Sequence, residues 1–200
     1  MPRQTEDIIR EIRGRREEIL KNLDPVRTYV KLKEMYERDE VQNPEFCSLF
    51  KKYYGLNRAG LGRNLENRFF ELLSEKRTDL EYILSELHKI PRLNGQRTIQ
   101  FVFATKLIHT VNNNKPIYDS KVSKVIEKEV DGNTKEEKIE SCKDIYKYLE
   151  RRLYPELLEN TQIRRIMLRF REIHQVNEST VGDIKVLDFI MWSLGDIKQE

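Results

Sequence analysis

Asp119 and Lys106 are the two side chains of this sequence that are best placed to do chemistry. Asp119 follows the segment KPIY and opens SKVSKV, a stretch whose apolar residues have helical spacing. A carboxylate at such a position either caps the helix that follows or serves as the acid of a reaction. Lys106 lies within residues 97–111, the most hydrophobic stretch of the chain, three residues before His109. The sequence thus offers two candidate catalytic residues, each with a structural alternative.

Residues 97–111 carry apolar side chains on almost every side, which predicts a helix in the middle of the core. Lys106 and His109 fall on its polar arc as neighbours at positions i and i+3. Because a buried ammonium is costly, Lys106 either reaches solvent, pairs with a carboxylate, or loses its proton and becomes a usable amine. His109 alone is typical of a satisfied core histidine. His88 and His174 are too distant in sequence to indicate a metal site.

The composition favours a cytoplasmic helical protein without a metal or another cofactor. Its 200 residues include only 8 glycines and 6 prolines, fewer than a β-rich protein usually carries. Cys47 and Cys142 stand far apart, which fits a reducing compartment and predicts neither a disulfide framework nor a cysteine metal cluster. No stretch approaches the roughly 20 apolar residues of a membrane span. The net charge of +3 does not by itself indicate a polyanionic partner, so any basic surface must come from local segregation.

Helical periodicity recurs along the chain, and strand-like alternation persists nowhere. We expect an all-α fold of about nine helices in a single domain, residues 1–200, with two lobes as one possible arrangement. The N-terminal helix is either peripheral to this domain or pairs with a partner helix, and the sequence sets no oligomeric state. Asn64 and Thr78 are expected as helix caps, the latter in a capping box with Glu81. The clearest helical segments are 4–23, 64–76, 78–90, 97–111, 136–154, 161–174 and 183–194.

Two short motifs flank the apolar segment. Upstream stands PRLNGQRT, residues 91–98, and downstream stands DSKVSKV, residues 119–125. Together they resemble the helix-hairpin-helix DNA glycosylase superfamily, whose members carry L-P-G-V-G-x-K-T-A, an apolar helix, a loop and then V-D-T-x-V-x-R-V. The similarity covers residues 90–126, under a fifth of the chain. The matching residues are Gly95, Arg97 and Thr98 in the first motif, and Asp119, Ser120, Val122, Lys124 and Val125 in the second.

The resemblance implies a site on double-stranded DNA. The hairpin of the family points backbone N–H groups at a DNA phosphate, and glycine allows that close approach. Asp119 would lie at the mouth of a cleft between two lobes, where it stabilises the sugar cation of base excision or activates the nucleophile. This requires the turn at Gly95 and the Asp119 carboxylate to border one groove. Nearby cations would add phosphate contacts: Arg63, Arg92, Arg97 and Lys124.

The sequence also departs from the family pattern. Arg92 replaces the first glycine of the hairpin, and Pro91 stands one residue too far upstream. Arg97 occupies the place of the lysine that forms a Schiff base in bifunctional members, and arginine does not lose its proton in proteins. A monofunctional glycosylase, with Lys106 as an auxiliary residue, or a relative without catalysis fits better. The four cysteines of the family's iron–sulfur cluster are absent.

Residues 162–173, QIRRIMLRFREI, separate into an apolar face and a basic face. The basic face carries Arg164, Arg165, Arg169 and Arg171. Such a face either holds phosphates or is solvated and paired with glutamates. A second overall interpretation therefore stays open: a non-catalytic helical binding or scaffolding protein, in which Asp119 is a cap and Lys106 belongs to a core ion pair.

Overall fold

The computed structural model describes residues 3–21 and 25–197, and all regular elements of this described part are helical. The expected all-α fold is confirmed. The chain divides into two compact units, which are described separately here: unit 1 comprises residues 1–23 and 113–200, and unit 2 comprises residues 24–112. Within the described ranges, no helix has both the length and the apolar character that a bilayer crossing requires.

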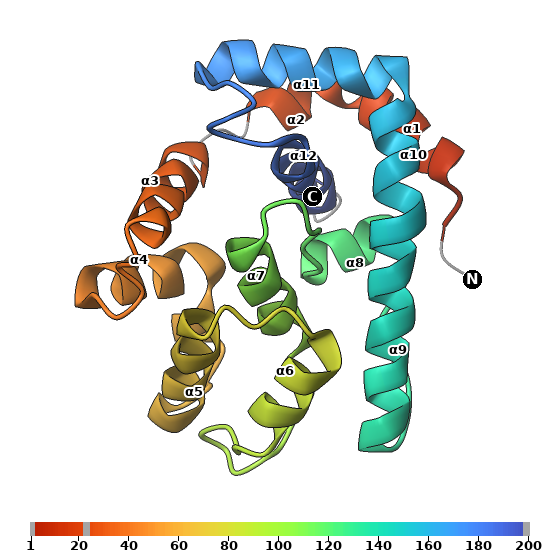
Figure 1. Ribbon diagram of the computed structural model, residues 1–200. Helices are drawn as coiled ribbons and strands as arrows, with labels where there is room; N and C mark the ends of the chain where they lie inside the picture. Colours follow the sequence, from red (N-terminus) through yellow and green to blue (C-terminus); the bar gives the residue numbers. More distant parts are fainter. Residues whose placement is uncertain (1–2, 22–24, 198–200) are drawn as a thin grey trace. The chain divides into compact units, whose positions relative to one another are not determined.

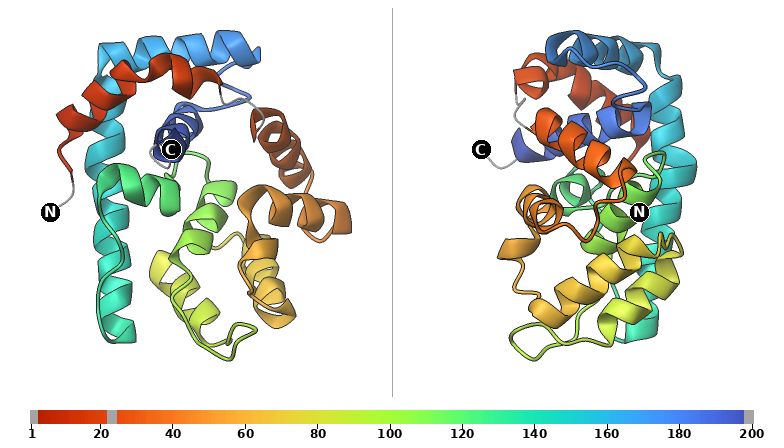
Figure 2. Two further views of the ribbon diagram at one scale, coloured as in Figure 1. Left: turned by 180° about the vertical axis from the view of Figure 1, so that it is seen from behind. Right: turned by 60° about the vertical axis from the view of Figure 1, so that its left-hand side comes forward.

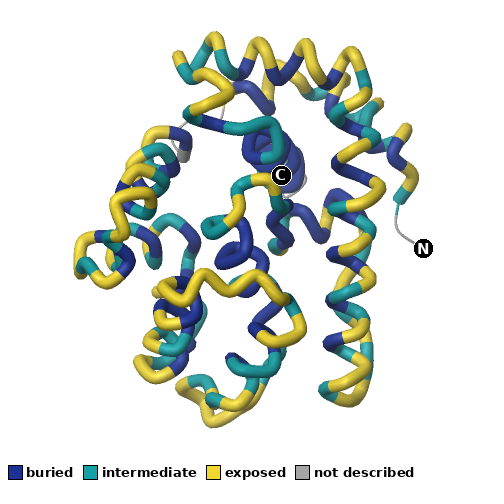
Figure 3. Tube along the Cα trace, in the orientation of Figure 1, coloured by how far each residue is buried: buried dark blue, intermediate teal, exposed yellow. Residues whose placement is uncertain are grey.

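Unit 1 combines the N-terminal segment with the C-terminal half of the chain (Figure 1). Its centre is the apolar helix α12, which packs against α2, α8, α10 and α11 and is buried along most of its length (Figure 3). The elements are α1 (Thr5–Gly14), α2 (Arg16–Lys21), α8 (Ser120–Ile126), α9 (Lys135–Tyr148), a π-helical turn (Leu149–Leu153), α10 (Tyr154–Glu159), α11 (Thr161–His174) and α12 (Asp183–Ile197).

Helices α8 and α12 approach each other closely because a glycine lies at their contact. A Cβ atom placed on Gly195 would lie 2.3 Å from the Lys121 carbonyl oxygen and 2.8 Å from the Lys121 Cα. Only a residue without a side chain permits this backbone-to-backbone packing. The glycine therefore sets the distance between the central helix and α8.

The single helix expected over residues 4–23 is two helices in the structure. The break falls at Arg15, and residues 22 and 23 of the prediction lie outside the described part. The N-terminal segment is not peripheral to unit 1, because Ile8 and Ile12 of α1 are fully buried and α1 packs against α10 and α11. Figures 1 and 2 show α1 and α2 running alongside α11.

The helix expected over residues 136–154 also differs, because a π-helical turn separates α9 from α10. One wide turn shifts the helix face, and π-turns occur frequently near functional sites. Tyr154, at the start of α10 and directly after this turn, is fully buried.

Unit 2 is organised around an aromatic cluster. The rings of Phe50 and Tyr54 lie 4.6 Å apart between centroids, and those of Phe50 and Phe69 lie 5.5 Å apart. Phe46 and Phe70 complete the cluster. The elements are α3 (Pro25–Glu37), α4 (Pro44–Tyr54), a 3₁₀ turn (Leu56–Arg58), α5 (Arg63–Ser74), α6 (Leu80–His88) and α7 (Phe101–Val111).

Two of the expected caps in unit 2 are wrong. Helix α5 begins at Arg63 after Gly62, one residue before the expected cap Asn64. Helix α6 is capped by Asp79, whose Oδ1 accepts a hydrogen bond from the Tyr82 N–H at 2.6 Å, so Thr78 is not the cap. Aspartate and threonine both cap helices, and the position three residues before Tyr82 is the one that the backbone donor can reach.

The apolar helix α7 begins at Phe101, four residues after the expected start at Arg97. Gln100 is the residue before the helix, and its side-chain amide donates to the Thr98 hydroxyl at 2.7 Å. Residues 97–100 therefore connect the 91–96 turn to the helix and are not part of it.

The buried thiol of Cys142 on α9 leads to a prediction about reactivity. Burial raises the pKa of Cys142 to about 12, and the thiolate is the form that reacts. We expect a maleimide at pH 7.5 to leave Cys142 unlabelled in the native protein and to label it after denaturation, as followed by peptide mass spectrometry. Cys47 is only partly buried and serves as the internal comparison. Native labelling of Cys142 as fast as that of Cys47 would contradict this burial.

Candidate functional site

Asp119 is the N-cap of α8. Its Oδ1 accepts hydrogen bonds from the backbone N–H groups of Lys121 at 2.9 Å and Val122 at 3.0 Å. These bonds satisfy two of the donors that have no partner inside the helix. The capping interpretation of Asp119 is therefore observed directly, and its side chain remains partly exposed.

Substitutions at Asp119 separate its capping role from any catalytic role. Asp119→Ala removes the acceptor, and we expect a loss of about 1 kcal/mol in the free energy of unfolding. Asp119→Asn keeps an oxygen in place, and asparagine caps as well as aspartate, so we expect near wild-type stability. Urea unfolding of both variants measures the difference. Equal stability of the alanine and asparagine variants would show that the cap contributes little.

The turn at residues 91–96 in unit 2 uses its backbone N–H groups within the protein. Gly95 adopts φ +78°, a left-handed conformation that suits glycine. Four N–H groups of the turn donate to protein acceptors at 2.9–3.1 Å, namely those of Arg92, Leu93, Gly95 and Gln96. The family resemblance implies that backbone N–H groups of this turn face a DNA phosphate. At these four positions the N–H groups are already hydrogen-bonded within the protein.

The same turn packs against the loop that precedes α5. The Arg92 guanidinium donates to the Ala59 carbonyl, and the Leu93 N–H donates to the Gly60 carbonyl at 3.1 Å. Arg97 and Arg63 follow these two segments and are both exposed. The structure therefore brings two of the sequence-predicted segments together within unit 2. Asp119 and Lys124 belong to unit 1.

Lys106 is buried on α7, with 8% of its surface exposed. Its Nζ donates to the Tyr54 carbonyl oxygen at 2.9 Å. The ammonium also lies 5.7 Å from the centroid of the Tyr54 ring and 5.5 Å from that of Phe103. A carbonyl oxygen and two aromatic faces thus contribute to holding this charge in the core of unit 2.

Asp188 on α12 is a buried acid that sequence reasoning missed. Its Oδ1 accepts hydrogen bonds from the Tyr154 hydroxyl at 2.6 Å and from the Ile117 N–H at 3.2 Å. Burial raises the pKa of Asp188 to about 7, and the charge of Asp119 acts in the same direction. Lys185 and the two hydrogen bonds oppose this rise. The signal in the sequence was a lone acid in an apolar run, VLDFIMW.

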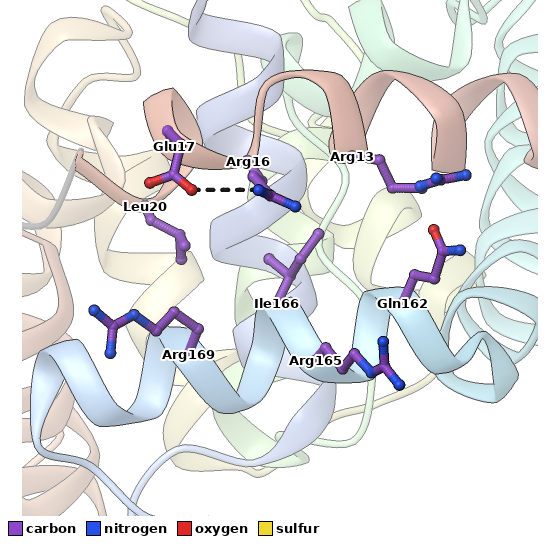
Figure 4. Close-up of a pocket in the computed structure, with 8 residues that line it drawn as sticks. All are labelled: Arg13, Arg16, Glu17, Leu20, Gln162, Arg165, Ile166 and Arg169. Atoms are coloured by element: carbon purple, nitrogen blue, oxygen red, sulfur yellow. Dashed lines mark hydrogen bonds and ion pairs between the residues drawn. The ribbon is translucent and has the colours of Figure 1, made fainter.

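An arginine-lined cleft lies in unit 1 between α1–α2 and α11 (Figure 4). Its volume is about 440 Å³. Leu20 and Ile166, from opposite sides, form an apolar floor, and both are buried. The polar lining consists of Arg13, Arg16, Glu17, Gln162, Arg165 and Arg169. We call this site the arginine cleft.

The arginine cleft is cationic. Its lining holds four arginines against one glutamate, which leaves three net positive charges. Arg16 pairs with Glu17 at 3.2 Å, and Arg169 pairs with Glu172 at 2.9 Å. Throughout residues 3–21 and 25–197, no carboxylate forms an ion pair with Arg13 or Arg165. The guanidinium groups of Arg13 and Arg165 can therefore form charge-assisted hydrogen bonds with a bound anion.

Only the α11 side of this site could be predicted from the sequence. Arg165 and Arg169 of the basic face line the cleft, and Arg169 also pairs with Glu172, as the alternative of a glutamate-paired face predicts. The other two arginines of that face have structural roles, since Arg164 donates to the Leu158 carbonyl and Arg171 donates to the Asp183 carboxylate at 2.7 Å. Arg13 and Arg16 carried no local signal, because their function depends on a packing partner about 150 residues later in the chain.

Comparison with known proteins gives no relative: no family model, no curated protein and no solved structure matches this chain. The geometry of the site carries the functional argument.

Proposed function

We propose that this protein binds DNA and that the arginine cleft of unit 1 contacts the phosphate backbone. The observation that carries the proposal is the pair Arg13 and Arg165, which lie on different helices, line one cleft and have no carboxylate partner among the described residues. Guanidinium groups bind phosphate oxygens in a bidentate geometry. When arginines neutralise phosphates, counterions are released from the DNA. This release supplies most of the affinity of non-specific DNA binding.

The resemblance of residues 90–126 to DNA glycosylases favours DNA among the polyanions. The resemblance lies in the identities of the residues. It does not extend to free backbone donors, because N–H groups of the 91–96 turn already donate to acceptors within the protein. Exposed cations of the two motifs, Arg97 and Lys124, are further candidate phosphate contacts, as is Arg63. In this proposal they add to the cleft and do not replace it.

A charge-reversal series tests the proposal. We expect the double variant Arg13→Glu/Arg165→Glu to lose about 10- to 100-fold in affinity for a labelled DNA oligonucleotide, because two phosphate contacts become repulsive. Lys147→Glu/Arg151→Glu is the matched control, with the same change in net charge at exposed positions outside the cleft. Fluorescence anisotropy at one fixed salt concentration measures both, and circular dichroism checks the fold.

The outcomes of this series are distinct. Equal losses in the two double variants would reduce the effect to net charge and would overturn the assignment to the cleft. A larger loss in Arg97→Glu than in the cleft variant would move the principal contact to the 91–98 segment. No DNA binding by the wild type would favour the alternative of a non-catalytic binding or scaffolding protein.

Base excision is a further proposal, and it depends on Asp119. Because asparagine preserves the cap of α8, Asp119→Asn removes the acid without removing the helix start. We expect alkali-dependent strand cleavage of a damaged or mismatched duplex by the wild type and its loss in Asp119→Asn. Cleavage at equal rates, or none by the wild type, would end the excision proposal and leave DNA binding intact.

A further inference from the structure

The two ends of the arginine cleft differ in charge. At one end lie Arg13, Gln162 and Arg165, and at the other lie Glu17, Leu20 and Arg169 (Figure 4). Both cations next to the second end are paired, Arg16 with Glu17 and Arg169 with Glu172. The end with Arg13 and Arg165 is therefore cationic, and the cations near the Glu17 end are neutralised by glutamates. The apolar floor lies between the two ends.

This polarity matches the chemistry of one nucleotide. A phosphate of a DNA strand carries one negative charge and suits the Arg13–Arg165 end, which lies at the other end of the cleft from the Glu17 carboxylate (Figure 4). A nucleobase has apolar faces that stack on aliphatic side chains and on guanidinium planes, which the floor formed by Leu20 and Ile166 and the adjacent arginines provide. The volume of about 440 Å³ falls in the range of small-ligand pockets.

The concave shape of the site excludes groove insertion. Proteins that read duplex DNA place a protruding helix or ribbon in the major groove. Here the floor residues lie in a recess between α1–α2 and α11, so a base contacts them only by entering this recess, and a base can enter only when it is unpaired. The arginines that line this recess can bind the neighbouring phosphates at the same time.

We propose that the arginine cleft accommodates one unpaired nucleotide of a DNA strand, with its phosphate between Arg13 and Arg165 and its base over Leu20 and Ile166. This inference rests on the proposed DNA binding and specifies its ligand. It makes the protein selective for unpaired over fully paired DNA.

Three oligonucleotides test the inference with the wild-type protein: a single strand, the same backbone with abasic residues, and the fully paired duplex. We expect the single strand to bind about tenfold more tightly than the abasic strand, because only the single strand has bases to stack on the guanidinium planes and the apolar floor, and more tightly than the duplex. Equal or tighter binding of the abasic strand or the duplex would overturn the inference while leaving DNA binding in place. Failure to bind any of the three would overturn the proposed function itself.

A pair of leucine variants locates the base. Leu20→Ala shortens the floor, and we expect it to reduce the preference for the single strand over the abasic strand to about twofold. Leu168→Ala is the matched control, because Leu168 lies on α11, is 59% exposed and does not line the cleft. An unchanged preference in Leu20→Ala, or an equal fall in Leu168→Ala, would contradict the placement of the base. The wild-type comparison stands if Leu20→Ala does not fold.

Discussion

Gly195→Ala is expected to destabilise unit 1 by about 2–3 kcal/mol. The added methyl group would lie 2.3 Å from the Lys121 carbonyl oxygen and 2.7 Å from its carbonyl carbon, well inside contact distance. These are backbone atoms, so a side-chain rotation cannot relieve the clash, and α8 must move away from α12. Overpacking of this kind costs about 1–3 kcal/mol or more, and the better helix propensity of alanine offsets only part of it.

Gly14→Ala is the matched control for this variant. A Cβ on Gly14, in α1 of the same unit, meets no atom within 4 Å, so we expect it to stabilise the protein by about 0.5 kcal/mol. Trp192 is the single tryptophan of the chain and lies in α12, so its fluorescence in urea reports the unfolding of unit 1. Equal free energies of unfolding for the two variants would show that α8 and α12 do not pack as closely as described.

Asp188→Asn is expected to stabilise unit 1 above pH 7 by about 2–4 kcal/mol. In the folded protein the pKa of Asp188 is about 7, whereas the ordinary pKa of an aspartate side chain is 3.8. Between these values, folding takes up a proton, so the contribution of Asp188 to stability is full below about pH 4 and falls as the pH rises to about 7. Each unit of the pKa difference corresponds to about 1.36 kcal/mol. Asparagine keeps the acceptor for Tyr154 and Ile117 but carries no charge.

The measurement is the difference between the variant and the wild type in the free energy of unfolding, followed through Trp192 from pH 4 to pH 8. Taking the difference removes the contributions of titrating groups that do not interact with Asp188, whereas Lys185, whose charge lowers the pKa of Asp188, does interact with it. We expect it to grow in favour of Asp188→Asn across this range. Asp188→Ala, which leaves the Tyr154 hydroxyl and the Ile117 N–H without this acceptor, is expected to be less stable than Asp188→Asn at every pH. A pH-independent difference would contradict the raised pKa of Asp188.

The fold class followed from the sequence because helical periodicity is a local property. The segments 161–174 and 183–194 were placed within a few residues of α11 and α12. The breaks were missed for a different reason. Nothing local distinguishes the π-turn at Leu149–Leu153 from a continuous helix. The loss of helix at residues 97–100 goes with a local hydrogen bond from the Gln100 amide to the Thr98 hydroxyl, which the apolar periodicity of the segment does not show.

The candidate site was less predictable than the fold. Asp119 was recognised as a helix start, and the structure shows its cap bonds. Asp188 stood in an apolar run, which is a sequence signal for a buried acid, but its partner Tyr154 is reached only through tertiary packing. Arg13 and Arg165 illustrate the same limit, since charge counting cannot tell which exposed arginines will face one cleft.

The salt dependence of DNA affinity tests the central claim most directly. The slope of log K against log salt concentration counts the phosphates that the protein neutralises, at about 0.7–0.9 per contact. We predict that Arg13→Gln/Arg165→Gln has a slope shallower than that of the wild type by about 0.7–0.9, since the phosphate held between these two arginines is no longer neutralised. The control Lys147→Gln/Arg151→Gln should keep the wild-type slope. An identical slope for the wild type and the cleft variant would contradict the account, because it would mean that neither arginine neutralises a phosphate.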